Sequence, residues 1–208
     1  MTTQHVHGSD VGLKLMPLIP VELDHGFGDL GLTLAKVLQK RKSIRDFSAR
    51  EVSLETLSHL LWAACGINRT DGAYRTVPSA KNWQEIDIYV AMESGLYVFD
   101  PHAFVLLPVL KEDIRAATGW QDFVPHAPIN LIYVANFAKM ENAPRKEQKF
   151  YAALDTGFIS QNVYLFCAAE GLATVVRGWV DRPALAEIMG LDSEQRVIVA
   201  QSVGYPQL

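Results

Sequence analysis

Apolar residues recur at helical spacing in three stretches of the chain. The pattern at 33–41 predicts a short helix, and a second helix begins after Ser53, a suitable N-cap, and ends at Gly66. The longest pattern, 147–171, has apolar side chains around most of its circumference. A helix of this kind lies in a core or an interface, and in a chain of this size we expect it to be shared with a second subunit.

Alternating and continuous apolar runs predict the strands. Residues 86–91 alternate in polarity, and 96–99 follows a Glu-Ser-Gly turn as the hairpin partner. A third short strand is expected at 104–107. The runs 129–137 and 196–203 are almost wholly apolar, which is typical of strands covered on both faces.

The order of these elements predicts an α+β fold, because the strands run together rather than alternating strictly with helices. No Gly-x-Gly-x-x-Gly motif follows a strand, so a dinucleotide-binding Rossmann unit has no support. Residues 8–31 are rich in glycine and proline and have no clear period. We therefore expect an extended N-terminal arm at 1–32 and a single domain at 33–208.

Composition excludes several classes of protein. The 208 residues are 49% hydrophobic, which rules out a disordered chain, and the net charge of −4 argues against nucleic-acid binding. No apolar run reaches the roughly 18–20 residues of a membrane span, and the first ten residues lack the pattern of a signal peptide. Cys65 and Cys167 lie in helical patterns and are expected to be buried thiols rather than metal ligands. We expect a cytoplasmic protein without a metal, a nucleic-acid partner or a membrane partner.

One basic run stands out against this acidic background. The segment from Lys40 to Phe47 holds four cations and a hydroxyl directly after a predicted helix. Guanidinium groups bind phosphate bidentately and stay charged at any working pH. On composition alone, an equally simple interpretation is that solvated cations offset the dipole of the helix C-terminus.

Two further segments offer polar groups to a ligand. Residues 67–84 are predicted as a loop, and its last part, Pro78 to Gln84, places hydroxyl and amide groups just before a strand, although an ordinary Pro-Ser/Asn turn has the same composition. In the segment 171–179, Gly178 would let its backbone N–H approach a ligand closely. Taken alone, that segment is only a helix end followed by a short strand.

Together, the order and spacing of these segments resemble the nitroreductase family of flavin mononucleotide (FMN) enzymes. The matching segments are Arg41-x-Ser43-x-Arg45-x-Phe47, Pro78-Ser79-Ala80-x-Asn82-x-Gln84, Asp155-x-Gly157-x-x-x-Gln161-Asn162 and Val203-Gly204-Tyr205-Pro206. The resemblance implies a mainly antiparallel central sheet flanked by helices, and a homodimer formed through long central helices with two FMN sites at its interface. The stretches 60–67 and 75–79 look more like the branch that oxidises azoline rings in modified peptides.

The resemblance also implies the residues of the cofactor site and its chemistry. By motif position, the site would consist of Arg41, Lys42, Ser43 and Arg45 at the phosphate and ribityl chain; Pro78, Ser79 and Asn82 at the isoalloxazine, from the same or the other subunit; and Val176, Arg177 and Gly178 along the ring, with the Gly178 N–H near the flavin N5. The family reaction is ping-pong hydride transfer from NADH or NADPH through FMN to a nitroaromatic, a quinone or a similar small-molecule acceptor.

The chain departs from the family pattern at two places. No basic residue follows the Gly-Tyr-Pro turn in this sequence, so the phosphate charge would be met by Arg41, Lys42, Arg45 or a further residue that the motifs do not identify. Arg177 stands where several nitroreductases carry a glutamate; a cation there would favour an anionic reduced flavin or anionic acceptors, whereas in the alternative its side chain points to solvent. Two other functions stay open: an azoline-oxidising flavin dehydrogenase, and a flavin-binding protein without turnover.

Overall fold

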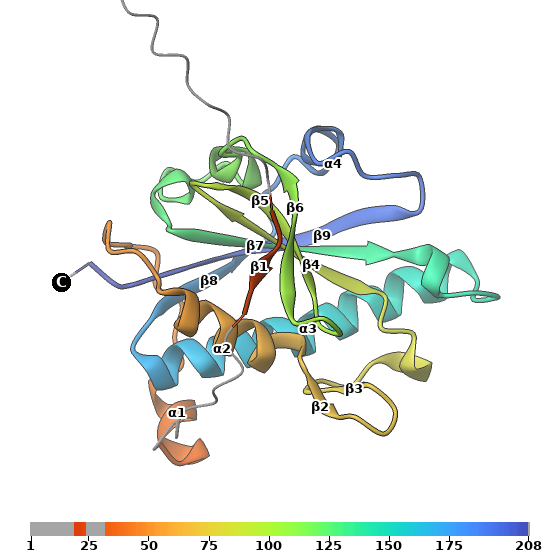
Figure 1. Cartoon of the computed structure of the whole chain (residues 1–208), viewed down its shortest axis with the longest axis horizontal. Helices are drawn as coiled ribbons and strands as arrows, with labels where there is room; N and C mark the ends of the chain where they lie inside the picture. The colour runs from red at the N-terminus through yellow and green to blue at the C-terminus, as the bar shows by residue number, and fades with distance from the viewer. Residues whose placement is uncertain (1–18, 24–31, 208) are drawn as a thin grey trace, which may run out of the picture.

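The computed structural model describes residues 19–23 and 32–207, and these form a twisted sheet with helices on both faces (Figure 1). The seven strands lie in the order β1-β6-β5-β4-β7-β9-β8, and every neighbouring pair is antiparallel. The strands are β1 (Val21–Glu22), β4 (Ile86–Met92), β5 (Gly95–Asp100), β6 (Val105–Leu110), β7 (Ile129–Asn136), β8 (Ala173–Arg177) and β9 (Gln195–Gly204). The α+β class and the antiparallel sheet are thereby confirmed.

Four α-helices accompany the sheet. They are α1 (Leu34–Lys40), α2 (Leu54–Cys65), α3 (Arg145–Glu170) and α4 (Arg182–Ile188). The predicted ends of α2 and α3 follow from capping: the Ser53 side chain accepts a hydrogen bond from the Thr56 N–H, and Gly171 closes α3 with φ +70°. The long helix predicted at 147–171 is confirmed as the 26-residue α3.

Strand β7 shows how the two faces of the sheet are covered. Its side chains alternate, so Leu131 and Tyr133 pack in the core with α2 and α3, whereas Ile132 and Val134 pack on the opposite face with α4. Figure 1 shows α2 and α3 below the sheet and α4 above it. Burial on both faces explains the continuous apolar run that predicted this strand.

The short elements differ from the sequence prediction. The predicted loop 67–84 contains a small hairpin, β2 (Ile67–Arg69) and β3 (Tyr74–Arg75). The described residues also form four short 3₁₀ helices, of which the first lies in the same loop and the other three lie in later connections. These are η1 (Ala80–Asn82), η2 (Arg115–Thr118), η3 (Val124–His126) and η4 (Phe137–Lys139). Within the expected arm, β1 pairs with β6 and so belongs to the sheet, while residues 1–18 and 24–31 lie outside the described part.

Both cysteines are buried free thiols, as predicted. Burial raises the pKa of Cys65 to about 11 and raises that of Cys167 still further, so neither thiol is activated. Within residues 19–23 and 32–207, no helix combines the length and apolar character needed to cross a bilayer.

Candidate functional site

Tyr164, on α3, joins two of the three sequence segments that were expected to form a site. Its hydroxyl lies 2.9 Å from the Ser43 hydroxyl and accepts a hydrogen bond of 3.0 Å from the backbone N–H of Val176. The Arg41 guanidinium stacks over the Tyr164 ring, 5.4 Å from its centre. Residues far apart in the sequence therefore meet at one aromatic side chain.

The basic run is held in place by the end of α1 and by the C-terminal strands. Arg41 caps α1, donating its N–H to the Val37 carbonyl, and the Ile44 N–H then bonds to Thr174 at the start of β8, 3.0 Å away. Further on, Phe47 forms a bridge with Pro206. This anchoring leaves Lys42, Ser43 and Arg45 exposed and Arg41 half-buried, so the cations are available to an anion from solvent.

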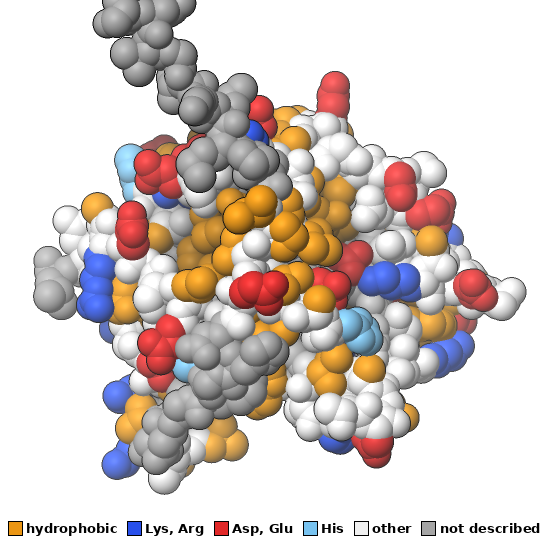
Figure 2. Space-filling view, viewed as in Figure 1, with side chains coloured by type: hydrophobic (Ala, Val, Ile, Leu, Met, Phe, Trp, Pro, Cys, Tyr) orange, Lys and Arg blue, Asp and Glu red, His pale blue; other side chains and the backbone are white. Residues whose placement is uncertain are grey.

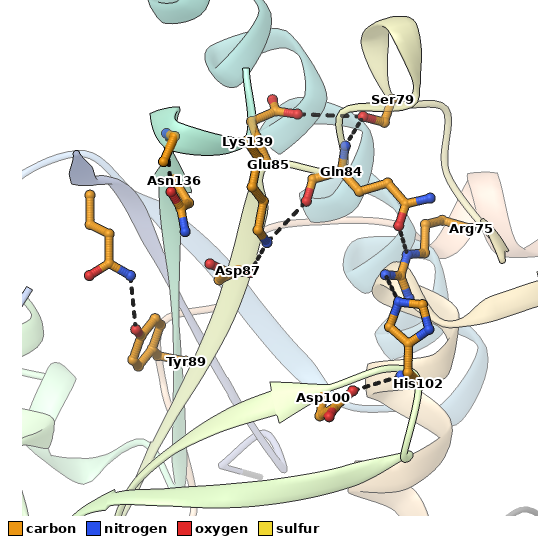
Figure 3. Close-up of polar contacts among 12 residues, drawn as sticks. Arg75, Ser79, Gln84, Glu85, Asp87, Tyr89, Asp100, His102, Asn136 and Lys139 are labelled. Carbon is orange, nitrogen blue, oxygen red and sulfur yellow. Dashed lines mark hydrogen bonds and ion pairs between the residues drawn. The ribbon is translucent and has the colours of Figure 1, made fainter. Parts of the chain in front are cut away.

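The Pro78–Gln84 loop is ordered by hydrogen bonds to α3 and to itself. The Ala80 N–H donates to a carboxylate oxygen of Asp155 at 2.9 Å. The Gln84 N–H donates to the Ser79 hydroxyl at 2.8 Å (Figure 3). Lys81, Asn82 and Gln84 have φ of +50°, +55° and +50°. Three non-glycine residues in the left-handed region within four positions mark strained backbone, which concentrates at functional sites. The loop keeps Pro78 and Asn82 exposed and Ser79 half-buried.

A buried pair of carboxyl groups, Glu85 and Asp155, supports this loop from behind. Their residues are 0% and 3% exposed, and the Glu85 carboxyl lies 3.4 Å from the Ser79 hydroxyl. Burial, together with the neighbouring Asp155, raises the pKa of Glu85 to about 7. Burial also raises the pKa of Asp155. The pair therefore holds a proton around neutral pH, which the sequence reading missed.

We expect Glu85→Gln to make the free energy of unfolding less dependent on pH. Because the folded-state pKa of Glu85 is raised from 4.5 to about 7, its favourable contribution is complete at low pH and is lost as pH rises through 7. The wild-type protein should lose up to about 3 kcal/mol between pH 5 and pH 8 through this group. Urea unfolding across this range checks the prediction.

The exposed Glu141→Gln variant is the matched control for that measurement. Glu85→Gln should be more stable than wild type at pH 8, whereas Glu141→Gln should follow the wild-type profile. Identical pH profiles for Glu85→Gln and wild type would show that Glu85 is not protonated in the folded state.

The two groups of candidate residues lie at different points along α3. Tyr164, which holds Arg41 and Ser43, is nine residues beyond Asp155, which holds the Ala80 N–H. Nine residues correspond to about 13–14 Å of helix axis. Within one chain, therefore, the structure joins the basic segment to β8 and keeps the Pro78–Gln84 loop apart from them.

The third group, at the end of β8, divides into exposed and buried parts. Gly178 is exposed, and a β-carbon built on it would meet no atom within 4 Å. Val176 is half-buried, and its N–H is bound to Tyr164. The backbone at Gly178 therefore faces open space that a flat ligand can occupy.

The Arg177 side chain does not face that space, nor does it point to solvent. It is 3% exposed, and its guanidinium donates to the Ser202 hydroxyl (3.0 Å), the Thr118 carbonyl (2.6 Å) and hydroxyl (3.2 Å), and the Asn130 amide oxygen (2.9 Å). Burial lowers the pKa of Arg177 to about 10. The interpretation in which this side chain points to solvent was wrong, because alternation along β8 turns it inward with Ala173 and Val175. An influence of its charge on a bound flavin or acceptor stays a prediction.

Comparison with known proteins agrees with this arrangement. The family model described as "Nitroreductase family" matches residues 38–205. A Methanocaldococcus jannaschii protein named "putative nitroreductase" is 33% identical over an alignment of 157 positions, and the match covers 71% of this chain and 79% of that protein.

Solved structures give the same result. A crystal structure titled as a "putative nitroreductase" from Ralstonia eutropha is 40% identical, has a TM-score of 0.87, and the match covers 91% of this chain and 90% of that one. An NADPH:FMN oxidoreductase from Vibrio harveyi, complexed with NAD+, shares the fold at 19% identity with a TM-score of 0.64, covering 84% and 69% of the two chains.

Proposed function

The chain belongs to the nitroreductase family, and on that premise we propose that it is an FMN-dependent oxidoreductase. It would take a hydride from NADH or NADPH and pass electrons to a nitroaromatic, a quinone or a similar acceptor. The observation that carries the proposal is the Tyr164 cluster, which brings Arg41, Ser43 and Val176 together. These residues come from two separate motifs to which the family resemblance gives a flavin-binding role.

The residues present fit FMN in charge and in shape. Arg41, Lys42 and Arg45 supply cations for a phosphate dianion, and the exposed Ser43 hydroxyl supplies a further hydrogen bond. The open space beside Gly178 lets a ligand approach its backbone closely. When bound, FMN supplies the capacity to accept a hydride and to release electrons, and the protein's part is to bind, orient and shield it.

The exposed surface of α3 favours a second copy of the chain as the partner. Phe150, Leu154 and Phe158 follow one another at four-residue spacing and are 63%, 42% and 37% exposed. A stripe of large apolar side chains on a 26-residue helix is typical of an interface. In a dimer built on this stripe, the Pro78–Gln84 loop of one subunit would complete the site formed by Tyr164 and Arg41 of the other.

The absorption spectrum of the purified protein tests the proposed function. We expect flavin peaks after incubation with FMN, and bleaching of these peaks when NADH or NADPH is added without oxygen. Reoxidation by a panel of nitroaromatics, quinones and azoline peptides then identifies the acceptor class. A protein that never takes up FMN would refute the proposal, and FMN that neither nicotinamide reduces would refute the proposed reductant.

We expect Arg41→Met to weaken FMN binding by about 10- to 100-fold, because one charge-assisted hydrogen bond contributes about 1.5–3 kcal/mol. Arg50→Met is a matched control, because Arg50 also stacks on a tyrosine, with its guanidinium 3.7 Å from the Tyr205 ring, but lies outside the basic segment. Quenching of flavin fluorescence measures both dissociation constants. Equal effects of the two substitutions would show that Arg41 does not contact the phosphate.

A further inference from the structure

A wedge-shaped cavity opens where β4 and β5 separate. Their pairing runs from Met92↔Gly95 to Tyr89↔Val98 and then stops, although β4 continues to pair with β7 as far as Ile86. β5 meanwhile follows β6 away from β4, as Figure 3 shows. The cavity left between the two strands has a volume of about 420 Å³, within the range of small-molecule sites. None of the ten predicted flavin contacts lines it.

Arg75, on β3, places a guanidinium without a direct ion-pair partner on the wall of this wedge, where Asp100 and Asp87 attract it only from a distance. The residue is 8% exposed, and its guanidinium donates to the Gln84 amide oxygen at 2.9 Å and lies 3.3 Å from the His102 ring nitrogen (Figure 3). The Nη1 nitrogen is buried and has no hydrogen-bond partner among the described residues. No carboxylate in that part of the chain forms an ion pair with Arg75. A buried guanidinium nitrogen without a hydrogen-bond partner is costly, and an anion bound in the wedge would satisfy it.

The other charged groups on the wall are already engaged. The Lys139 ammonium lies 2.6 Å from the Asp87 carboxylate. One oxygen of Asp100 accepts the backbone N–H groups of His102 and Ala103, at 2.8 and 3.2 Å. Arg75 is therefore the charged group on the wall that still has a hydrogen-bond donor available for a ligand. Asp87 and Asp100 would repel a ligand that carries more than one negative charge.

The remainder of the wall is apolar, with contributions from Trp83, Ile88, Phe99 and Leu107. Figure 2 shows apolar side chains gathered over β4, β5 and β6 on this face, with acidic and basic side chains at the edge of the patch. We propose that the wedge binds a small organic monocarboxylate with an apolar body, its carboxylate on Arg75 and its body between β4 and β5. The wedge shares Trp83 and Gln84 with the Pro78–Gln84 loop but none of the predicted flavin contacts, and its failure would leave the FMN proposal intact.

Binding of para-bromobenzoate to the FMN-saturated protein tests this inference, because the bromine atom can be located by anomalous scattering. We expect bromine density between β4 and β5 in soaked crystals and saturable binding by calorimetry. Bromine density over the flavin alone, or density in the wedge without binding in solution, would overturn the inference.

Two substitutions test the wedge as a binding site in different ways. Arg75→Met removes the charge, and Leu107→Trp fills the cavity from a residue that is 37% exposed and so tolerates enlargement. Both should weaken para-bromobenzoate binding at least 10-fold, whereas the control Arg50→Met should not. Thermal unfolding identifies a misfolded variant, and wild-type affinity in a folded Leu107→Trp protein would contradict the proposed site.

Discussion

Leu154→Asp is expected to convert the protein to monomers and to weaken FMN binding by at least about 100-fold. Leu154 is at the centre of the apolar stripe of α3, with Phe150 and Phe158 one turn away on either side. Burying an unpaired carboxylate in an interface costs several kcal/mol, and in a two-fold symmetric dimer each substitution is present twice. FMN binding is expected to fall together with dimerisation, because the proposed site takes its Pro78–Gln84 loop from the partner subunit.

Ile188→Asp is the matched control, because Ile188 on α4 is 43% exposed and Leu154 is 42% exposed. Light scattering after size exclusion gives the mass of each variant, and a flavin titration gives its affinity. Ile188→Asp should behave as wild type in both measurements. A dimeric Leu154→Asp protein would show that the stripe on α3 is not the interface, and a monomer that binds FMN normally would place the whole site in one chain.

Arg177→Met should destabilise the fold by about 3 kcal/mol or more, because it removes four hydrogen bonds and leaves buried acceptors without a donor. The bonds tie β8 to β7, β9 and η2, so the effect is expected on the whole domain rather than on one loop. Chemical denaturation measures the free energy of unfolding directly. FMN binding by the folded fraction should change little, since the guanidinium faces the interior.

Arg182→Met provides the comparison for this prediction. Arg182 also donates from its guanidinium, to the Ile198 and Gly178 carbonyls, but it is exposed and water can replace it. Its substitution should change the stability by no more than about 0.5 kcal/mol. If Arg177→Met were equally mild, the buried network around Arg177 would not be a stabilising element.

The long elements could be predicted from the sequence because their apolar patterns are set by burial. Strand β7 and helix α3 fall within a few residues of the predicted ranges. The hairpin strands β2 and β3 are only three and two residues long, and no periodic pattern can build up over so few positions. The seven-residue helix α4 was not predicted either. Their stability comes from contacts that only the fold creates.

The sequence predicted which segments form the candidate site, but not how their side chains are arranged in space. Tyr164 and Glu85 were missed because their partners are distant in sequence: Ser43 lies 121 positions from Tyr164, and Asp155 lies 70 positions from Glu85. The inward orientation of Arg177 follows from strand alternation once the bounds of β8 are known. The sequence alone had only the family motif at that position, which assigned Arg177 a place along the ring and did not give the direction of its side chain.

A heterodimer built from two defective chains tests most directly whether the FMN site is shared between subunits. One chain would carry Arg41→Met with Arg45→Met, the other would carry Asn82→Leu, and two affinity tags would isolate the mixed dimer. Each homodimer should bind FMN poorly, but the heterodimer should bind about one FMN per dimer with wild-type affinity, because one of its two sites is assembled from unaltered segments. A heterodimer that binds no more FMN than its parents would contradict the shared site.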